Sequence, residues 1–272
     1  MPGPPETPGY GSIYQEFDSP LMRQLRREAH GDGDIGQYSW VTADELAADI
    51  PRLQLSRESH LLDLGCGPCG PLTFVIAQAG CRGTGVDFSA EAIAAGHARG
   101  VSMQLQDSLT LRVGDLNDCL PYPAATFNAV MSVDVILHVR ERGAVFREVA
   151  RMLAPGGRFL FTDAAVVTGA ISSEEVVRRA PHGPIQLAPP GFNERMLTQA
   201  GLRLLEQHNR TASLQKNAAG RLAARLSHRA EVEELEGPEA WQRQIQYLET
   251  MVVLAHRGAL SRIMYLAESA TS

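Results

Sequence analysis

Short apolar runs alternate with longer, helix-periodic segments between residues 60 and 163. Runs of this length predict buried strands, and apolar positions recurring every three or four residues predict helices. Alternating strands and helices predict parallel pairing, right-handed crossovers and helices on both faces of one sheet. The predicted strands are 60–64, 82–88, 109–115, 127–135 and 156–163, and the predicted helices are 71–80, 89–100 and 140–153.

The remaining chain is predicted to be mostly helical. Two further strands, 202–209 and 261–268, complete a doubly wound, mostly parallel seven-stranded α/β sheet, and the apolar alternation of the last strand is typical of a position near the sheet edge. The predicted organisation is a disordered tail at 1–11, an N-terminal helical lid at 12–58 and a sheet domain at 59–272 with a helical insertion around 211–258. Other predicted helices are 13–27, 43–50 (capped by Thr42 and stopped by Pro51), 172–179, 193–200, 213–236 and 238–257.

Composition and charge exclude several classes of function. A net charge of -6 argues against a nucleic-acid or anionic-membrane binder, which normally carries a basic face. No apolar run can span a bilayer and the first residues lack a signal-peptide pattern, so we expect a cytoplasmic protein. Lys216 is the only lysine and lies in a polar stretch, which excludes a P-loop and makes a Schiff-base mechanism untenable.

A glycine-rich loop follows the first predicted strand. It contains Gly65, Gly67 and Gly70, which let a ligand approach the backbone closely at the carboxyl end of a parallel strand. The same pattern occurs in nicotinamide enzymes, but Asp63 would place a carboxylate near the pyrophosphate. A carboxylate instead favours a ligand that is cationic at this point, as the ammonium and sulfonium of S-adenosylmethionine are.

The next two predicted strands also end in acidic residues. Asp87 suits a ribose diol, which binds a bidentate acceptor, although nicotinamide folds share this feature. Asp115 can accept a hydrogen bond from an adenine amino group, and the Leu116 amide can meet a ring nitrogen. Each of these acids could also be an ordinary loop or cap residue, but their placement at successive strand ends favours one shared ligand.

These segments together resemble class I S-adenosylmethionine-dependent methyltransferases. The matching segments are "LLDLGCGPCGP", "GVDFS", "VGDLND", "FNAVMSVDVILHV" and "EVARMLAPGGRFLFTD", in the family's order from Leu61 to Asp163. One departure is Cys69, where such families often have glycine. The resemblance implies a Rossmann-like methyltransferase domain at 59–272 and S-adenosylmethionine as the cofactor.

A narrower resemblance is to the small-molecule sarcosine/dimethylglycine N-methyltransferase group. It rests on the "GDGDIGQYSW" loop before the fold and on Asp134 and His138 after the fourth strand, although "GQYSW" is not typical of the sarcosine enzymes themselves. It implies that Asp134 and His138 are catalytic, although His138 could equally be a packing residue. The residues implied to bind the cofactor are Tyr14, Gln37, Asp63, Gly65, Cys66, Gly67, Asp87, Phe88, Asp115, Leu116, Ser132 and Val133.

The resemblance therefore predicts methyl transfer to an N, O or C atom of a small molecule, in secondary or specialised metabolism. A neutral His138 would serve as a base for a hydroxyl or a carbon acid, and would only hold an amine. Asp163 is a weaker candidate for substrate contact, and Trp241, Tyr247 and Met251 have a spacing more typical of packing. The two alternatives are a nicotinamide-dependent oxidoreductase and a non-catalytic S-adenosylmethionine-binding protein.

The expected partners are a small-molecule methyl acceptor and, as a possibility left open, a second copy of the chain in a homodimer. Neither nucleic acid nor a membrane is expected. Cys66 and Cys69 form a C-x-x-C, but neither Cys81 nor Cys119 supplies a second pair with similar spacing. A structural zinc site would need such a pair, so no metal site is expected.

Overall fold

A seven-stranded sheet forms the centre of the computed structural model, which describes residues 10–270. The strand order is β3-β2-β1-β4-β5-β7-β6, and β7 runs antiparallel to both of its neighbours. The predicted doubly wound α/β fold is therefore confirmed. The strands are β1 (His60–Leu64), β2 (Arg82–Asp87), β3 (Leu109–Val113), β4 (Phe127–Val133), β5 (Leu153–Val167), β6 (Leu202–Asn209) and β7 (Leu260–Ser269).

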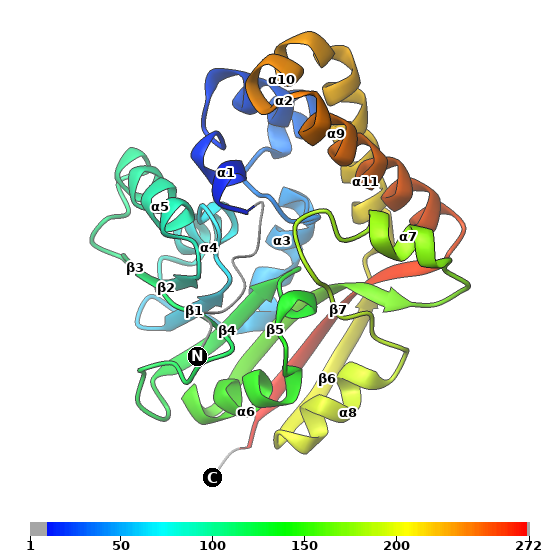
Figure 1. Cartoon of the computed structure of the whole chain (residues 1–272). Coiled ribbons are helices and arrows are strands. Elements are labelled where there is room, and N and C mark those ends of the chain that lie inside the picture. The colour runs from blue at the N-terminus through cyan, green and yellow to red at the C-terminus, as the bar shows by residue number, and fades with distance from the viewer. Residues whose placement is uncertain (1–9, 271–272) are drawn as a thin grey trace, which may run out of the picture.

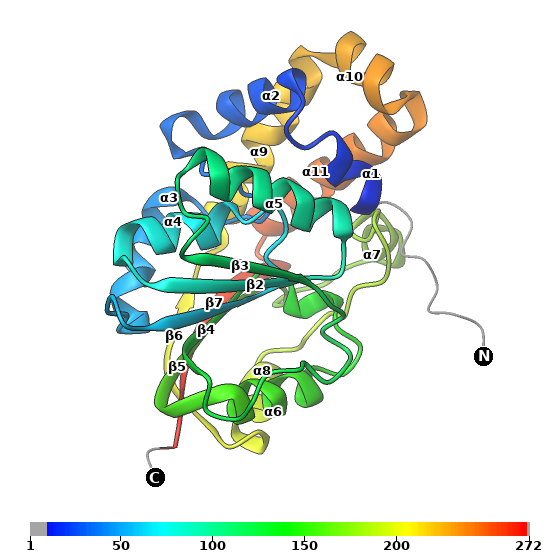
Figure 2. The ribbon, with the colours of Figure 1, turned by 90° about the vertical axis from the view of Figure 1, so that its left-hand side faces the viewer.

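Helices cover both faces of the sheet (Figure 2). On one face lie α3 (Ala43–Asp49), α4 (Gly70–Ala79) and α5 (Ala90–Ser102), and on the other lie α6 (Arg142–Met152) and α8 (Phe192–Gln199). Each face has its own apolar core, because the central strands are apolar on both sides. The strand order reverses between β1 and β4, and in such sheets ligands bind beyond the carboxyl ends of the strands at this point.

A group of helices from both ends of the chain gathers at one end of the sheet (Figure 1). Here α2 packs against α9, and α9 packs against α11. The group consists of α1 (Tyr10–Gln15), α2 (Pro20–His30), α9 (Thr211–Ser227), α10 (Arg229–Glu236) and α11 (Pro238–His256). The shorter elements are α7 (Ser173–Arg178) and the 3-10 turns η1 (Gly31–Gly33), η2 (Ile50–Leu53) and η3 (Ile136–His138).

Two local predictions need correction. The single helix predicted over 13–27 is interrupted after Gln15, because α2 starts anew at Pro20 with the Ser19 hydroxyl accepting a hydrogen bond from the Met22 amide. The final strand is not alternately exposed: β7 lies between β5 and β6 and is buried on both faces along nearly its whole length.

Other predictions are answered more simply. The Thr42 cap is confirmed, since its hydroxyl accepts a hydrogen bond from the Glu45 amide. The tail predicted at 1–11 lies outside the described residues except for its last two positions, which begin α1. Three helices occupy the stretch between β6 and β7. No helix within residues 10–270 combines the length and apolar character that crossing a membrane requires.

Candidate functional site

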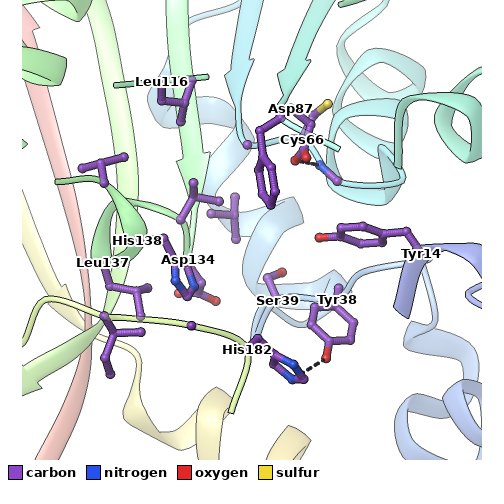
Figure 3. Close-up of a pocket in the computed structure, with 18 of the residues that line it drawn as sticks. Tyr14, Tyr38, Ser39, Cys66, Asp87, Leu116, Asp134, Leu137, His138 and His182 are labelled. Carbon is purple, nitrogen blue, oxygen red and sulfur yellow. Dashed lines mark hydrogen bonds between the residues drawn. The ribbon is translucent and has the colours of Figure 1, made fainter. Parts of the chain in front are cut away.

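One cavity of about 370 Å³ lies at the carboxyl ends of β1, β2, β3 and β4. Cavities of this size are typical of small-molecule sites. Every predicted site residue lines it except Gln37 and Ser132. Figure 3 shows Asp87 and Cys66 at the top of the cavity and His138 and Asp134 at the left, with Tyr14 at the right and Ser39, Tyr38 and His182 below.

The glycine loop is folded by its own backbone and by Asp87. The amides of Gly65 and Cys66 both donate to the Val86 carbonyl, at 2.8 and 3.1 Å. Gly65 has φ +75°, and a Cβ on it would come within 2.4 Å of the Val135 side chain. Gly67 has φ +53°, and a Cβ there would point at the Tyr14 hydroxyl, 3.4 Å away. The loop is thus a bare backbone surface on which a ligand can rest.

Asp87 is held in a fixed orientation at the end of β2. One carboxylate oxygen accepts a hydrogen bond from the Gly67 amide at 2.8 Å, and the other accepts from the Ser89 amide at 3.0 Å. Burial nevertheless raises the pKa of this carboxyl group above its ordinary value. Each oxygen retains a lone pair, so the carboxylate can still accept both hydroxyls of a ribose diol.

Asp63 is the most unusual charged group in the site. It is 2% exposed and lines the cavity, and its carboxylate forms no side-chain hydrogen bond or ion pair within the described part of the chain. Burial, and then the neighbouring charge of Asp87, raise the pKa of Asp63 well above its ordinary value. A buried carboxylate without a cation is costly unless a ligand supplies one. The site therefore fits a ligand with a positive charge beside β1.

The residues predicted to meet a base lie farther along the same edge of the sheet. Asp115 accepts hydrogen bonds from the backbone amide and the side chain of Asn117, at 2.8 and 2.7 Å, and Leu116 lines the cavity beside it. Phe88 lines the cavity although half of its surface is exposed. An open aromatic face next to hydrogen-bonding groups suits a stacked heterocycle.

Gln37 and Ser132 do not reach the cavity, and this corrects their predicted cofactor role. The Gln37 side chain accepts from the Ile35 amide at 2.9 Å and donates to the Gly33 carbonyl at 3.0 Å, so it folds its own loop. The Ser132 hydroxyl is fully buried and donates to the Leu64 carbonyl at 2.9 Å, joining β4 to β1. The polar groups of both side chains are therefore hydrogen-bonded to backbone groups.

The N-terminal loop is fastened against the cofactor loop. A Cβ on Gly70 would come within 2.3 Å of the Gly36 carbonyl oxygen, so only glycine allows the two backbones this close. From the other side, Asn217 of α9 donates to the carbonyls of Trp40 and Val41. The lining residues Tyr38 and Trp40 are positioned by these contacts.

Asp134 is engaged in a buried ion pair. Its carboxylate accepts from the Arg262 guanidinium at 2.8 Å, from the Trp40 amide at 2.8 Å and from the Thr162 hydroxyl at 2.8 Å. Arg262 is fully buried and also pairs with Glu45 of α3. Asp134 has φ +60°, a left-handed conformation that turns the chain sharply after β4. These contacts tie the strand end to the N-terminal segment.

His138 lies in η3 at the opposite end of the cavity from Asp87. Burial is the main factor that lowers the pKa of His138, to about 4, and the nearby Arg179 charge lowers it further. The Pro184 carbonyl accepts a hydrogen bond from the ring and opposes this shift. At neutral pH the ring is therefore uncharged. In a neutral imidazole one nitrogen is a hydrogen-bond donor and the other is an acceptor.

Sequence reasoning missed much of the wall beside His138. The missed lining residues lie before the first strand or after β5, in loops and in helix α9, and they are Tyr38, Ser39, Trp40, Arg179, His182 and Arg221. Tyr247, interpreted from its spacing as a packing residue, also lines the cavity, whereas Trp241 and Met251 belong to apolar cores. Asp163 is fully buried against Arg142 and Asn193 and does not line the cavity.

The two cysteines of the C-x-x-C have different surroundings: Cys66 lines the cavity, and Cys69 packs against α5. Cys66 and Cys69 are both buried, and the thiol of Cys69 lies against Gly96 of α5. Cys69 has φ +62°, so it occupies a conformation that favours glycine, at the position where the family pattern often has that residue. Within residues 10–270 no cluster of three or more His, Cys, Asp or Glu side chains is arranged to hold a metal ion.

Comparison with known proteins agrees with this geometry. Residues 62–161 match the family described as methyltransferase domain. The 27-O-demethylrifamycin SV methyltransferase of Amycolatopsis mediterranei is 29% identical over 202 residues, which are 71% of this chain and 72% of the relative. The glycine/sarcosine/dimethylglycine N-methyltransferase of Actinopolyspora halophila is 31% identical over 64% of this chain, but this match spans only 30% of that relative's length.

The fold is shared with solved structures as well. A protein of Galdieria sulphuraria, described as a sarcosine dimethylglycine methyltransferase, superposes with a TM-score of 0.75 over 84% of each chain at 21% identity. The family match covers Asp63 and Asp87, which lie on β1 and β2, and Asp115 and Asp134, which follow β3 and β4. The chain is a class I S-adenosylmethionine-dependent methyltransferase of the small-molecule type.

Proposed function

We propose that this enzyme methylates a hydroxyl group of a small molecule, with His138 as the general base. The observation that carries the proposal is that one cavity holds Asp63 and Asp87 at one end and an uncharged His138 at the other. S-adenosylmethionine, when bound, supplies a methyl group on a sulfonium, which needs no further activation. The protein must then align the acceptor, exclude water and take up the acceptor's proton.

The cofactor would be held by the carboxylates and by the bare loop. Asp63 would accept from the ammonium group, Asp87 from the ribose hydroxyls, and Asp115 with Leu116 would meet the adenine. The fit rests on the unpaired Asp63 carboxylate and on the space left at Gly67, which Tyr14 borders. Tyr14 and Phe88 would cover the bound molecule, consistent with the proposed lid role of segment 12–58.

His138 would act on the acceptor, and Asp134 would act through its contacts. The acceptor nitrogen of His138 would take the hydroxyl proton as the carbon–oxygen bond forms and the carbon–sulfur bond of the sulfonium breaks. Asp134 has its oxygens occupied by Arg262, Trp40 and Thr162, so we assign it a positioning role: it fixes the strand end that leads into His138. A hydroxyl suits this wall better than a protonated amine, because the guanidinium groups of Arg179 and Arg221 would repel an ammonium group.

The A. mediterranei relative bears a name that implies methylation of an oxygen, which is consistent with this choice. N-methylation is the second candidate, favoured by the A. halophila relative, and then His138 would only orient the amine. A homodimer and a cytoplasmic location remain proposals from the sequence. Size-exclusion chromatography with light scattering tests the first, and cell fractionation tests the second.

The test is transfer of a labelled methyl group from S-adenosylmethionine to panels of phenols, aliphatic alcohols and amines, with the product identified by mass spectrometry. We expect O-methylated products, and we expect His138→Gln to lower kcat by ~100-fold or more while leaving the Kd for S-adenosylhomocysteine nearly unchanged. His97→Gln, on the exposed side of α5, is the matched control and should behave as wild type. Transfer to amines alone, undiminished in His138→Gln, would reject the proposal.

A further inference from the structure

The wall of the cavity beside His138 contains two guanidinium groups from different elements. Arg179 directly follows α7, and Arg221 lies on α9. Neither forms an ion pair with a carboxylate in the described part of the chain. Arg179 is buried and Arg221 is half-buried. By contrast, the buried Arg142 pairs with Asp163, and the buried Arg262 pairs with Asp134 and Glu45.

Arg179 is the more exceptional of the two. It is 4% exposed. It donates a hydrogen bond to the Ala164 carbonyl at 3.3 Å, and its guanidinium lies 5.6 Å from the centre of the Tyr247 ring. Its Nε–H is buried without any hydrogen-bond partner. A guanidinium has five N–H donors and stays protonated, so its burial without a full set of hydrogen-bond acceptors is energetically costly.

Arg221 is fixed more completely but is also not neutralised. It donates to the carbonyls of Tyr38 and Ser39, at 2.9 and 2.6 Å, and lies 4.9 Å from the centre of the Trp40 ring. These contacts anchor the N-terminal loop. These acceptors are neutral carbonyl groups, so they satisfy N–H donors of Arg221 without neutralising its positive charge.

Asp134 acts on Arg221 through its charge, but neither Asp134 nor Glu45 forms an ion pair with Arg179 or Arg221 within the described residues. Asp134 is held by Arg262, the Trp40 amide and Thr162, and Glu45 is held by Arg262 and the Ser213 hydroxyl. The two histidines of this wall, His138 and His182, are uncharged at neutral pH, since the pKa of each is lowered to about 4. The cavity therefore has two carboxylates at the Asp63–Asp87 end and, beside His138, two guanidinium groups that form no ion pair within the described residues.

We propose that the methyl acceptor carries an anionic group, a carboxylate or a phosphate ester, that binds Arg179. This inference rests on the proposed function, because it assigns the second ligand of the same cavity. An oxyanion would accept the hydrogen bonds that Arg179 leaves unmade, and a planar carboxylate or a phosphate matches the guanidinium fork. The aromatic surfaces of Tyr247, Tyr38 and Trp40 would surround the remainder of the acceptor.

Anion binding would also affect the base. The Arg179 charge is one of the causes that lower the pKa of His138, and an anion paired with that charge would offset it. The bound acceptor would then make His138 a stronger base than it is in the empty cavity. An anionic acceptor would thus take part in its own deprotonation, which a neutral analogue of the same shape could not do.

The experiment is calorimetric titration of the protein, with and without saturating S-adenosylhomocysteine, by benzoate, phenyl phosphate and the neutral isostere benzamide. We expect at least one anion to bind 10-fold or more tightly than benzamide, and the stronger of the two identifies the source of the charge. Arg179→Gln should abolish this preference, and Arg179→Lys should keep part of it. Arg178→Gln, next in sequence but exposed and paired with Glu174, is the control and should keep all of it.

The outcomes separate this inference from the proposed function. Equal affinity for anions and benzamide, or an anion preference that survives Arg179→Gln, would overturn the inference. Failure to bind S-adenosylhomocysteine would overturn the proposed function, while the titrations without it still decide the anion site. Thermal unfolding checks the fold of each variant: Arg179→Met should unfold no lower than wild type, because it removes a buried charge that has no anion, and a marked loss of stability would show a structural role instead.

Discussion

The clearest single perturbation of the cofactor site is Asp63→Asn, which removes a charge and keeps the shape. Asp63 is 2% exposed with a strongly raised pKa and no cation beside it. In the empty protein the carboxylate is therefore a burden, and an unsatisfied buried polar group costs about 1–3 kcal/mol. In the proposed complex it would accept a hydrogen bond from the ammonium group, and a hydrogen bond to a charged group contributes about 1.5–3 kcal/mol.

The two effects have opposite signs. Asp63→Asn should leave the unfolding free energy of the empty protein unchanged or raise it, and should weaken S-adenosylhomocysteine binding about 10- to 150-fold. Because the pKa of Asp63 is raised in the folded state, the folded protein binds more protons than the unfolded chain between the two pKa values. The free energy of unfolding is therefore highest at low pH and decreases as the pH rises towards the folded-state pKa of Asp63. The stabilising effect of Asp63→Asn should therefore be larger at pH 8 than at pH 5.

The assay combines denaturant unfolding of the empty protein with calorimetric titration of S-adenosylhomocysteine. Asp107→Asn is the matched control, since Asp107 is exposed and lies before β3, away from the cavity. It should change neither quantity. A variant that is less stable than wild type yet binds S-adenosylhomocysteine normally would refute the reasoning, because Asp63 would then be a structural acid.

Two further predictions concern the N-terminal segment. Gly70→Ala should destabilise the protein by about 1–3 kcal/mol and weaken S-adenosylhomocysteine binding, because the new Cβ meets the backbone of Gly36. The control is Gly143→Ala on α6, where the atoms nearest to the new Cβ are 3.5 Å away. Equal stability of the two variants in urea unfolding would contradict this prediction. Burial lowers the pKa of His30 to about 4, so between pH 6.5 and 4 the unfolded chain binds more protons than the folded protein. The free energy of unfolding should therefore decrease as the pH is lowered through this range, by up to about 3 kcal/mol from this residue. His30→Gln should make that fall shallower and His256→Gln, on the exposed end of α11, should not; identical pH profiles of chemical unfolding would argue against it.

The central sheet and the cofactor end of the cavity could be predicted because their signals are local. A short apolar run that ends in an acid marks both a buried strand and the point where the chain leaves it, as at Asp63, which Gly65 follows, and again at Asp87. Parallel strands bring such exits to one edge, so chemistry at successive strand ends converges without any knowledge of packing. The helices on both faces follow from the same alternation.

The acceptor end could not be predicted because its residues meet only in three dimensions. Arg179, Arg221 and Tyr247 come from separate helical or loop segments, and nothing in their local sequence distinguishes a cavity wall from a packed face. Gln37 is the opposite case: its side chain, predicted to bind the cofactor, is hydrogen-bonded to backbone groups of its own loop. Whether Asp134 is open to a ligand depended on Arg262, far away in the sequence on β7.

The most direct test of the central claim compares S-adenosylhomocysteine with NADH by calorimetric titration of the same protein. The claim is that carboxylates at the ends of β1 and β2 make the glycine loop select a cationic adenosyl ligand over an anionic dinucleotide. It predicts one saturable site for S-adenosylhomocysteine, tighter still for S-adenosylmethionine if Asp63 also senses the sulfonium, and no measurable heat from NADH. Saturable binding of NADH without binding of S-adenosylhomocysteine would contradict it.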